Sequence, residues 1–446
     1  MRRSPFSDSL LVSSRELVYF QCFVDNYMNF FLLMFNWKKM KKNLQPTTPR
    51  VNLDDLLAVA TRADGVLTGV RSSMLAPTAA KSPPLFSATQ VGEICGLDAA
   101  GMQYRVRKGE LPAASELEPG KKRKMFTLSD ARSWARHFRK KTLRPEATGG
   151  IVIAAANFKG GVSKTTTAVT LAQGLSLRGH KVLVIDMDPQ GSTSNLFGFL
   201  NADIDDDLTL LPLCYGTEVS VDYAVQRTYW DGIDIIPASL SLYSAEFALP
   251  SRQKDSADFE FWNVLKYGID TAREVYDVII IDTPPALSYL TINALLAADG
   301  LIMPIPPSTL DFTSSTQFWN LFNQLANSLI KMQGKTKEFD FVSVLLARVD
   351  SNDTSSTVVR EWISAAYGEI VLPVEIPKTS VTSAASAEFG TVYDANVSEI
   401  NARTYRRAFD AYERFVDLIE GQLQVAWTRQ LNELAQGNDT VNVGGQ

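Results

Sequence analysis

Two lysines that flank a pair of glycines, followed directly by threonines, have residue types and a spacing suited to holding phosphate. They lie between Ile151 and Thr167, in IVIAAANFKGGVSKTTT, where an apolar run leads into a glycine-containing loop and then into a helical pattern. This order predicts a phosphate cradle, because glycines let backbone N–H groups approach an anion closely and a helix N-terminus favours negative charge. We expect Lys164 to reach the terminal phosphates and the Thr165 hydroxyl to bind magnesium.

The loop departs from the usual phosphate-binding pattern G-x-x-x-x-G-K-[ST], whose two glycines would fall on Phe158 and Ser163. It reads K-G-G-x-x-K-T instead, with an additional lysine, Lys159, at its entrance. This spacing resembles the deviant Walker A box of the ParA/MinD ATPases. The resemblance implies that ATP and magnesium are bound by a loop made of Lys159, Gly160, Gly161, Val162, Ser163, Lys164, Thr165 and Thr166.

Two later strands end in carboxylates. The first, KVLVID, ends at Asp186 and is followed by Asp188, and the second, YDVIIIDTPP, ends its apolar run at Asp282. The second resembles the Walker B strand of ParA proteins, and we expect Asp282 to hold magnesium through a water, since magnesium keeps most of its hydration shell. The resemblance, which covers most of residues 149–400, implies that Asp188 orients the attacking water and that Asp186 supports the magnesium shell.

The predicted catalytic residues are Lys159, Lys164 and Asp188. Members of this family form ATP-sandwich homodimers in which the early lysine crosses to the partner's nucleotide, so the resemblance implies hydrolysis that depends on dimerisation. Phosphoryl transfer to water needs positioning and charge neutralisation more than covalent help. His137 and His180 are the only histidines, and without a general base that titrates near neutrality we expect slow turnover.

Apolar runs at regular intervals predict the fold. They cover residues 233–239, 278–282, 301–306, 341–347 and 370–374, and each is nearly continuous, as in strands buried on both faces of a parallel sheet. With the acidic residues at strand ends, they predict an α/β fold with a doubly wound, mainly parallel sheet and a ligand at its carboxyl edge.

Length and composition predict several domains. The chain has 446 residues, 45% of them hydrophobic and 21% charged, which is typical of a globular protein with two or three domains. The three cysteines include no CxxC pair, which argues against a disulfide scaffold or a zinc site. In residues 1–39 no apolar run reaches the ~18 residues of a membrane span, and no signal-peptide cleavage site follows. We expect this segment to be a non-native or disordered extension, with Met40 as the natural start. We also expect an ATPase domain at residues 149–435 and a disordered tail at 436–446.

The segment between these parts is predicted to bind DNA. Apolar residues at spacings of three and four predict a helix within residues 40–84, followed by a linker; the helix either associates two subunits, as in longer ParA proteins, or packs on its own domain. In residues 85–143, Ser87 is expected to cap a first helix, and Ser129 or Asp130 to cap a later helix over residues 131–138. This segment resembles the winged, MerR-like helix–turn–helix module of those proteins. It contains twelve Lys or Arg against six Asp or Glu, although the whole chain has a net charge of −5. We expect DNA contacts from Arg105, Arg107, Lys108, Lys121, Lys122, Arg123 and Lys124, the alternative being a solvated basic face.

The leading hypothesis is an ATP-dependent DNA-partition protein, cytoplasmic and associated with the nucleoid, that works with a ParB-like partner and represses its own operon. A nucleotide-switched transcriptional regulator and a MinD-like positioning ATPase are the alternatives. The polar, glycine-rich end GNDTVNVGGQ lacks the basic amphipathic anchor of MinD proteins, which argues against membrane attachment.

Overall fold

The computed structural model describes residues 51–74, 81–117, 123–200, 203–256, 258–331, 334–379, 390–395 and 401–443. The chain divides into two compact units, residues 1–74 and 75–446. In the first unit, α2 spans Leu53–Met74 and confirms the helix predicted there, and its Leu53 and Leu57 side chains are exposed. The extension predicted at residues 1–39 lies outside the described residues.

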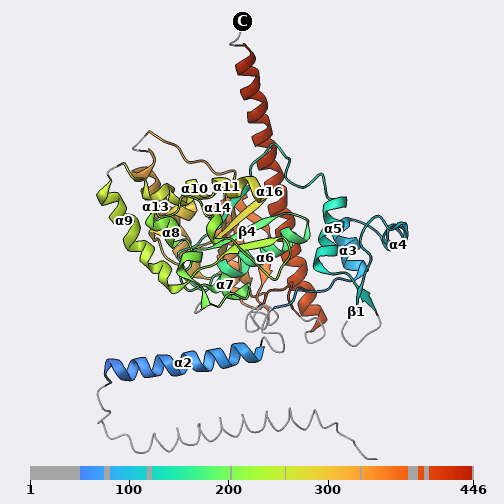
Figure 1. Ribbon diagram of the computed structural model, residues 1–446, viewed down its shortest axis with the longest axis horizontal. Helices are drawn as coiled ribbons and strands as arrows, with labels where there is room; N and C mark the ends of the chain where they lie inside the picture. The colour runs from blue at the N-terminus through green and yellow to red at the C-terminus, as the bar shows by residue number, and fades with distance from the viewer. Residues whose placement is uncertain are drawn as a thin grey trace, which may run out of the picture. The chain divides into compact units, whose positions relative to one another are not determined.

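An eight-stranded sheet organises the second unit (Figure 1). Its order is β10-β9-β8-β3-β7-β4-β6-β5, and every neighbouring pair is parallel except β5 with β6. The predicted doubly wound, mainly parallel α/β fold is therefore confirmed, with the short edge strand β5 as an element that the sequence did not indicate. The strands are β3 (Ile151–Ala155), β4 (Val182–Asp186), β5 (Gln226–Arg227), β6 (Ile233–Ile236), β7 (Val278–Asp282), β8 (Gly300–Ile305), β9 (Phe341–Val349) and β10 (Val371–Pro377).

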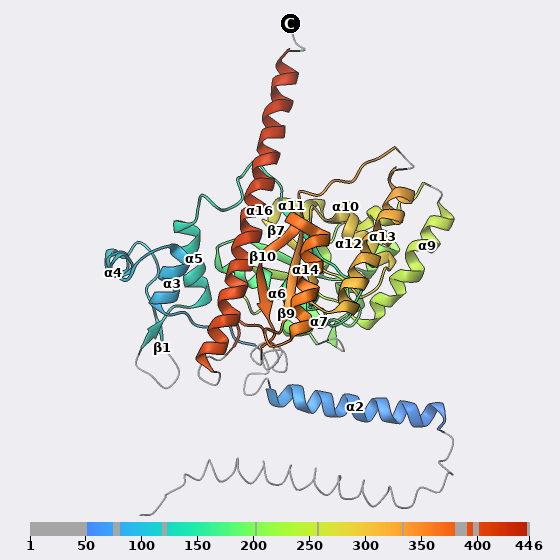
Figure 2. The ribbon, with the colours of Figure 1, turned by 180° about the vertical axis from the view of Figure 1, so that it is seen from behind.

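Successive residues of each strand point to opposite faces of the sheet and enter two hydrophobic clusters. Val152 and Ala154 belong to one cluster with residues of α12, α13 and α14, whereas Ile151 and Ile153 belong to the other with residues of α6 and α16. Figures 1 and 2 show these helices on the two faces. The helices are α6 (Lys164–Leu177), α7 (Ser192–Leu196), α8 (Leu211–Tyr215), α9 (Ala245–Asp255), α10 (Val264–Gly268), α11 (Asp270–Val275), α12 (Tyr289–Ala297), α13 (Thr309–Leu329), α14 (Thr354–Tyr367) and α16 (Ala402–Val443).

A small module precedes the sheet and contains α3 (Ala88–Cys95), α4 (Ala99–Lys108), β1 (Glu116–Leu117), β2 (Lys124–Met125) and α5 (Leu128–Phe138). Ser87 caps α3 as predicted, and Gly96, with φ 67°, closes the turn before α4. The predicted caps of α5, Ser129 and Asp130, were wrong. Thr127 is the N-cap, because its hydroxyl and the Asp130 carboxylate each accept the other residue's backbone N–H and together satisfy two donors at the helix start.

Two arginines of α5, and Arg139 directly after it, join this module to the sheet domain. Arg132 Nε donates to the Ser176 carbonyl (3.0 Å), and Arg136 Nη1 donates to the Gly179 carbonyl (2.5 Å), both at the C-terminal end of α6. Arg139 forms an ion pair with Glu420 of α16. Positive charge at a helix C-terminus is favourable, so α5 is fixed against the far end of the helix that begins at the phosphate loop.

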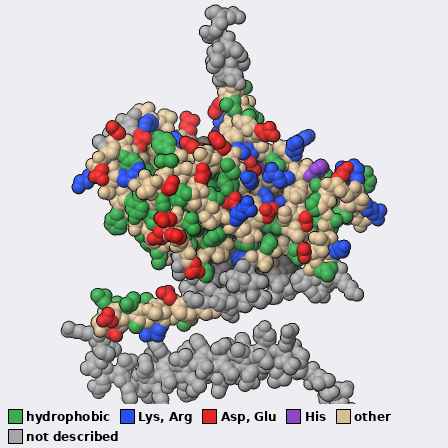
Figure 3. Space-filling view, viewed as in Figure 1, with side chains coloured by type: hydrophobic (Ala, Val, Ile, Leu, Met, Phe, Trp, Pro, Cys, Tyr) green, Lys and Arg blue, Asp and Glu red, His purple; other side chains and the backbone are tan. Residues whose placement is uncertain are grey.

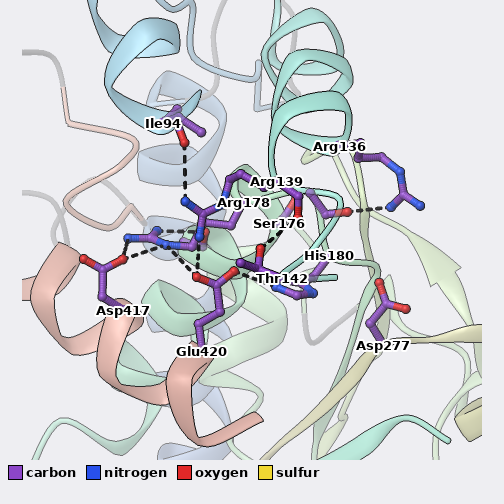
Figure 4. A network of polar contacts seen from close by, with 12 residues as sticks. Ile94, Arg136, Arg139, Thr142, Ser176, Arg178, His180, Asp277, Asp417 and Glu420 are labelled. Carbon is purple, nitrogen blue, oxygen red and sulfur yellow. Dashed lines mark hydrogen bonds and ion pairs between the residues drawn. The ribbon is translucent and has the colours of Figure 1, made fainter. Parts of the chain in front are cut away.

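Glu420 is the acidic centre of a buried network (Figure 4). Its Oε1 lies 2.9 Å from His180 Nε2, and Arg178 Nε lies 3.8 Å from Oε2. Burial tends to raise the pKa of Glu420, but the hydrogen bond with His180 and the charges of Arg139 and Arg178 lower it overall. The carboxylate therefore stays ionised inside the protein and links three parts of the chain.

The C-terminal helix is longer than predicted. α16 continues to Val443, whereas residues 436–446 were expected to form a disordered tail. An established helix adds residues at little cost even when their propensities are modest, because nucleation has already occurred. Among the described residues, no helix combines the length and the apolarity that crossing a membrane requires.

Replacing Glu420 with alanine should destabilise the protein by about 3–5 kcal/mol, because removing one partner of a buried ion pair leaves the other charges uncompensated. Chemical unfolding followed by circular dichroism measures the effect. Glu433→Ala, an exposed acid of the same helix, is the matched control and should change stability by less than about 0.5 kcal/mol. Equal stability of the two variants would contradict the structural role of the network.

Candidate functional site

The loop between β3 and α6 has a fixed and partly strained backbone. Asn157, directly after β3, accepts the Lys159 N–H on Oδ1 (3.1 Å) and donates from Nδ2 to the Pro304 carbonyl (3.0 Å). Ser163 adopts φ 76°, a left-handed conformation that few residues other than glycine favour. Sequence reasoning missed Asn157, although a buried amide where an apolar strand meets a glycine loop was the available signal.

Lys164, the first residue of α6, is turned back toward the loop. Its Nζ donates to the Lys159 carbonyl (2.9 Å), and the residue is 7% exposed. Burial lowers the pKa of Lys164, although Asp282 and Asp188 nearby oppose the shift. A buried ammonium that has one carbonyl and two neighbouring carboxylates is well placed to pair with an anion entering the loop.

Asp282 ends β7 beneath the loop and is fully buried. Its Oδ2 accepts from the hydroxyls of Thr165 (2.7 Å) and Thr193 (2.8 Å). Burial raises the pKa of Asp282 to about 6, against the lowering effect of both threonines. The structure thus brings the predicted magnesium residues Thr165 and Asp282 into contact and adds Thr193, which carried no recognisable motif.

This arrangement fits a magnesium ion. Asp282 Oδ1 is buried and has no hydrogen-bond partner among the described residues. An unpaired anionic oxygen beside a threonine hydroxyl suits a cation that prefers oxygen ligands and uses one or two carboxylates with phosphate oxygens. No group of three or more His, Cys, Asp or Glu in the described part of the chain could hold a metal, so the remaining ligands would come from phosphates and water.

The two predicted carboxylates after β4 occupy different environments. Asp186 is buried, and its oxygens accept the Ser194 N–H (2.8 Å), the Ser194 hydroxyl (2.7 Å) and the Asp188 N–H (3.1 Å). Burial first, and Asp282 second, raise the pKa of Asp186 to about 8. Asp188 is half-buried and accepts the Gln190 N–H (3.0 Å). Asp188 lines a cavity together with residues of the loop, while Asp186 orders the segment that carries Asp188.

A cavity of about 560 Å³ joins most of these residues. Of the residues predicted for the site, Gly160, Gly161, Ser163, Lys164, Thr165, Thr166 and Asp188 line it; Val162, Asp186 and Asp282 are buried and do not. The lining residues that no motif indicated include Arg348, Ile376, Pro377 and Tyr412, from much later in the chain. A site of this size accommodates a nucleotide-sized ligand.

Lys159 points away from this cavity. Its Nζ lies 2.5 Å from Oδ1 of Asp311, near the start of α13, and Asp311 is 8% exposed. Ser308 caps α13 and holds Asp311 by accepting its N–H (3.2 Å). The additional lysine of the loop is therefore held by an acid of its own chain.

Some of the predicted DNA-contacting residues are exposed and others are paired. Arg107, Arg123 and Lys124 are exposed, whereas Lys108 and Arg105 lie 2.5 Å and 3.6 Å from Glu110. Lys121 and Lys122 lie outside the described residues. Figure 3 shows Lys and Arg side chains interspersed with acidic ones over this end of the unit. The count of twelve basic residues overstated the free charge, because Arg132, Arg136 and Arg139 bind the sheet domain and α16.

Comparison with known proteins identifies the family to which this chain belongs. The AAA domain family matches residues 150–333. Protein SopA of Escherichia coli K12 is 30% identical over 344 residues, which cover 76% of this chain and 88% of SopA. The chromosome partitioning protein ParA of Caulobacter vibrioides is 32% identical over 227 residues, which cover 51% of this chain and 80% of that protein. The chain belongs to the ParA-type family of partition ATPases.

A solved structure titled Partition Protein has the same fold as this ParA-type chain, with a TM-score of 0.56 at 18% identity. The alignment covers 83% of this chain and 97% of that structure. Ser163, at the end of this loop, holds a left-handed backbone conformation that only glycine adopts without strain. A serine keeps the backbone N–H that an anion would use.

Neutralising Asp311 should release Lys159. Asp311→Asn keeps the size of the side chain and leaves the Ser308 cap of α13 in place, but it removes the charge that holds the lysine. If Lys159 acts on a second subunit of this ParA-type protein, we expect a two- to tenfold higher hydrolysis rate per subunit at low protein concentration, where association limits activity.

The measurement is steady-state phosphate release against protein concentration. The exposed Asp203→Asn serves as a control for lost charge and should behave like the wild-type protein. A rate that Asp311→Asn leaves unchanged, or lowers at every concentration, would show that the ion pair does not restrain Lys159.

Proposed function

We propose that this protein is an ATP-dependent DNA-partition protein that segregates a plasmid or a secondary replicon. The observation that carries the proposal is the Thr165–Asp282 contact beside the loop, with Asp282 Oδ1 free for a cation. ATP and magnesium are the ligands that this donor set fits. Because the chain belongs to the ParA-type family of partition ATPases, we assign ATP hydrolysis by this protein to DNA segregation.

The chain's own residues have separable tasks in hydrolysis. Lys164 and the loop N–H groups bind the β- and γ-phosphates; Thr165 and Asp282 would hold magnesium, whose charge would offset that of the phosphates. Asp188, at the rim of the cavity, accepts a hydrogen bond from the attacking water and orients it. Lys159 leaves Asp311 and neutralises charge on the nucleotide of the partner subunit. Because the site positions the attacking water without a strong general base, we expect slow turnover. Slow hydrolysis suits a protein whose ATP-bound state must persist for a set time.

The proposed partners follow from the remaining surfaces. A homodimer closes over two nucleotides and binds DNA non-specifically, and a ParB-like protein accelerates hydrolysis. Arg407 and Arg414 of α16 line a hollow of about 760 Å³ beside β10, together with the acidic Glu375 and Asp410. The two arginines are the proposed contacts to DNA outside the nucleotide cavity. The protein acts in the cytoplasm on the nucleoid.

The α3–α5 module adds specific DNA binding and repression of the protein's own operon. Two capped helices joined by a tight turn, followed by an antiparallel ribbon, have the layout in which a second helix meets DNA and a ribbon contacts its backbone. The exposed Arg107 of α4 and Arg123 and Lys124 at the ribbon support this role. The same module favours the second candidate function, a nucleotide-switched transcriptional regulator.

The Asp188→Ala variant distinguishes a role of this carboxylate in hydrolysis from a role in nucleotide binding. We expect ATP affinity within about threefold of the wild-type value and at least a hundredfold slower hydrolysis, because positioning of the water is lost while the cradle is kept. The variant should therefore accumulate as an ATP-bound dimer on DNA. Nucleotide binding by fluorescence titration and DNA retention by gel shift measure the two effects.

Asp203→Asn again controls for the loss of one negative charge. The Lys164→Ala variant should not bind ATP. Partition further requires that DNA and the ParB-like protein together accelerate hydrolysis by the wild-type protein. Operator affinity that changes with nucleotide, without any such acceleration, would favour the transcriptional regulator. An Asp188→Ala variant that hydrolyses ATP normally would remove Asp188 from the mechanism.

A further inference from the structure

Arg348 is a strained residue at the edge of the nucleotide cavity. Among the described residues that are not glycine, only Ser163 and Arg348 have a positive φ, and that of Arg348 is 55°. Both residues line the same cavity, although 185 positions separate them in the chain. A strained backbone persists only where the surrounding structure enforces it, and such residues cluster at functional sites.

The strain has a structural origin in the pairing of β9 with β10. Leu346 pairs with Glu375 and Val349 pairs with Pro377, so three steps along β9 match two steps along β10. The additional residue is a β-bulge, a feature that redirects a side chain beside an active site. Arg348 lies in this bulge and is exposed, while its neighbours Ala347 and Val349 are buried.

The redirected side chain contacts the phosphate loop. Arg348 Nη1 donates a hydrogen bond of 2.6 Å to the Gly161 carbonyl, and in the described part of the chain Arg348 forms no ion pair. Because a trans peptide directs its C=O and N–H in opposite directions, fixing the Gly161 carbonyl also fixes the direction of the Val162 N–H. Gly161, which has φ 74°, carries no Cβ, so without this hydrogen bond rotation about its Cα–C bond would meet little steric resistance.

We propose that Arg348 is a positioning residue for the phosphate cradle. It holds the peptide between Gly161 and Val162 in the orientation that presents the Val162 N–H to the bound phosphate, so that the cradle is formed before the nucleotide arrives. The inference rests on the proposed binding of nucleotide to this loop. It adds a residue from the end of β9, which no phosphate-binding motif contains.

The proposal predicts weaker binding of both ADP and ATP, because the phosphate that the cradle holds is common to the two. We expect Arg348→Ala and Arg348→Gly to bind each magnesium nucleotide about tenfold more weakly than the wild-type protein, measured by isothermal titration calorimetry on the full chain. Hydrolysis should show a raised KM and a kcat within about threefold of the wild-type value.

Two comparisons separate positioning from general effects of the substitution. Glycine removes the backbone strain that alanine retains, so Arg348→Gly should melt at a higher temperature than Arg348→Ala while binding equally weakly. Arg227→Ala removes an exposed arginine from β5, at the opposite edge of the sheet, and should bind nucleotide like the wild-type protein. The tenfold loss should also persist at 0.5 M salt, where attraction between separated charges is largely screened.

Three results would overturn the inference: wild-type affinity in Arg348→Ala and Arg348→Gly, a loss confined to ATP, or a loss that disappears at high salt. The last two would mean that the guanidinium acts on the γ-phosphate or as a distant charge. If the wild-type protein binds no nucleotide, the proposed function fails. If it binds nucleotide and Lys164→Ala does not, while the Arg348 variants bind normally, the role of Arg348 alone fails.

Discussion

The buried carboxylate of Asp282 is the constraint around which the site is arranged. Asp186 pairs with Asp282 in register on the adjacent strand β4, and both side chains are fully buried. Two neighbouring carboxylates without solvent cannot both remain charged at low cost, and burial accordingly raises the pKa of both groups. Hydrogen bonds from Thr165 and Thr193 stabilise the charge of Asp282 only in part, so the site favours a cation beside it.

Helix α6 connects this site with the rest of the second unit. It begins at Lys164, where its free N–H groups face the loop, and the arginines of α5 bind carbonyls near its far end. Glu420 of α16 joins Arg139 of the module to Arg178 and His180 beyond the end of α6. A change at the phosphate loop and a change in the α3–α5 module therefore act on opposite ends of one buried helix.

The sequence predicted the sheet well, because strands buried on both faces have long apolar runs and end in residues with clear chemistry. The spacing of lysines, glycines and threonines indicated the loop, and the resemblance to ParA proteins implied roles for Asp188 and Asp282, but no pattern predicted the contact between Thr165 and Asp282. Contacts made by tertiary structure could not be predicted. The Lys159–Asp311 pair joins residues 152 positions apart, and Arg348 reaches the loop through a bulge that depends on the register of two strands. The cap at Thr127 differed from prediction because several neighbouring residues could serve equally well.

The dependence of ATP affinity on magnesium, compared between the wild-type protein and Asp282→Asn, tests the account most directly. Asparagine preserves the shape of the side chain and relieves its repulsion with Asp186, so the fold should tolerate it, but it removes the anionic oxygen that faces the cation. We predict that magnesium strengthens ATP binding at least tenfold in the wild-type protein and that Asp282→Asn loses this gain while keeping its affinity without magnesium. An equal gain in both proteins would contradict a site built around the Asp282 carboxylate.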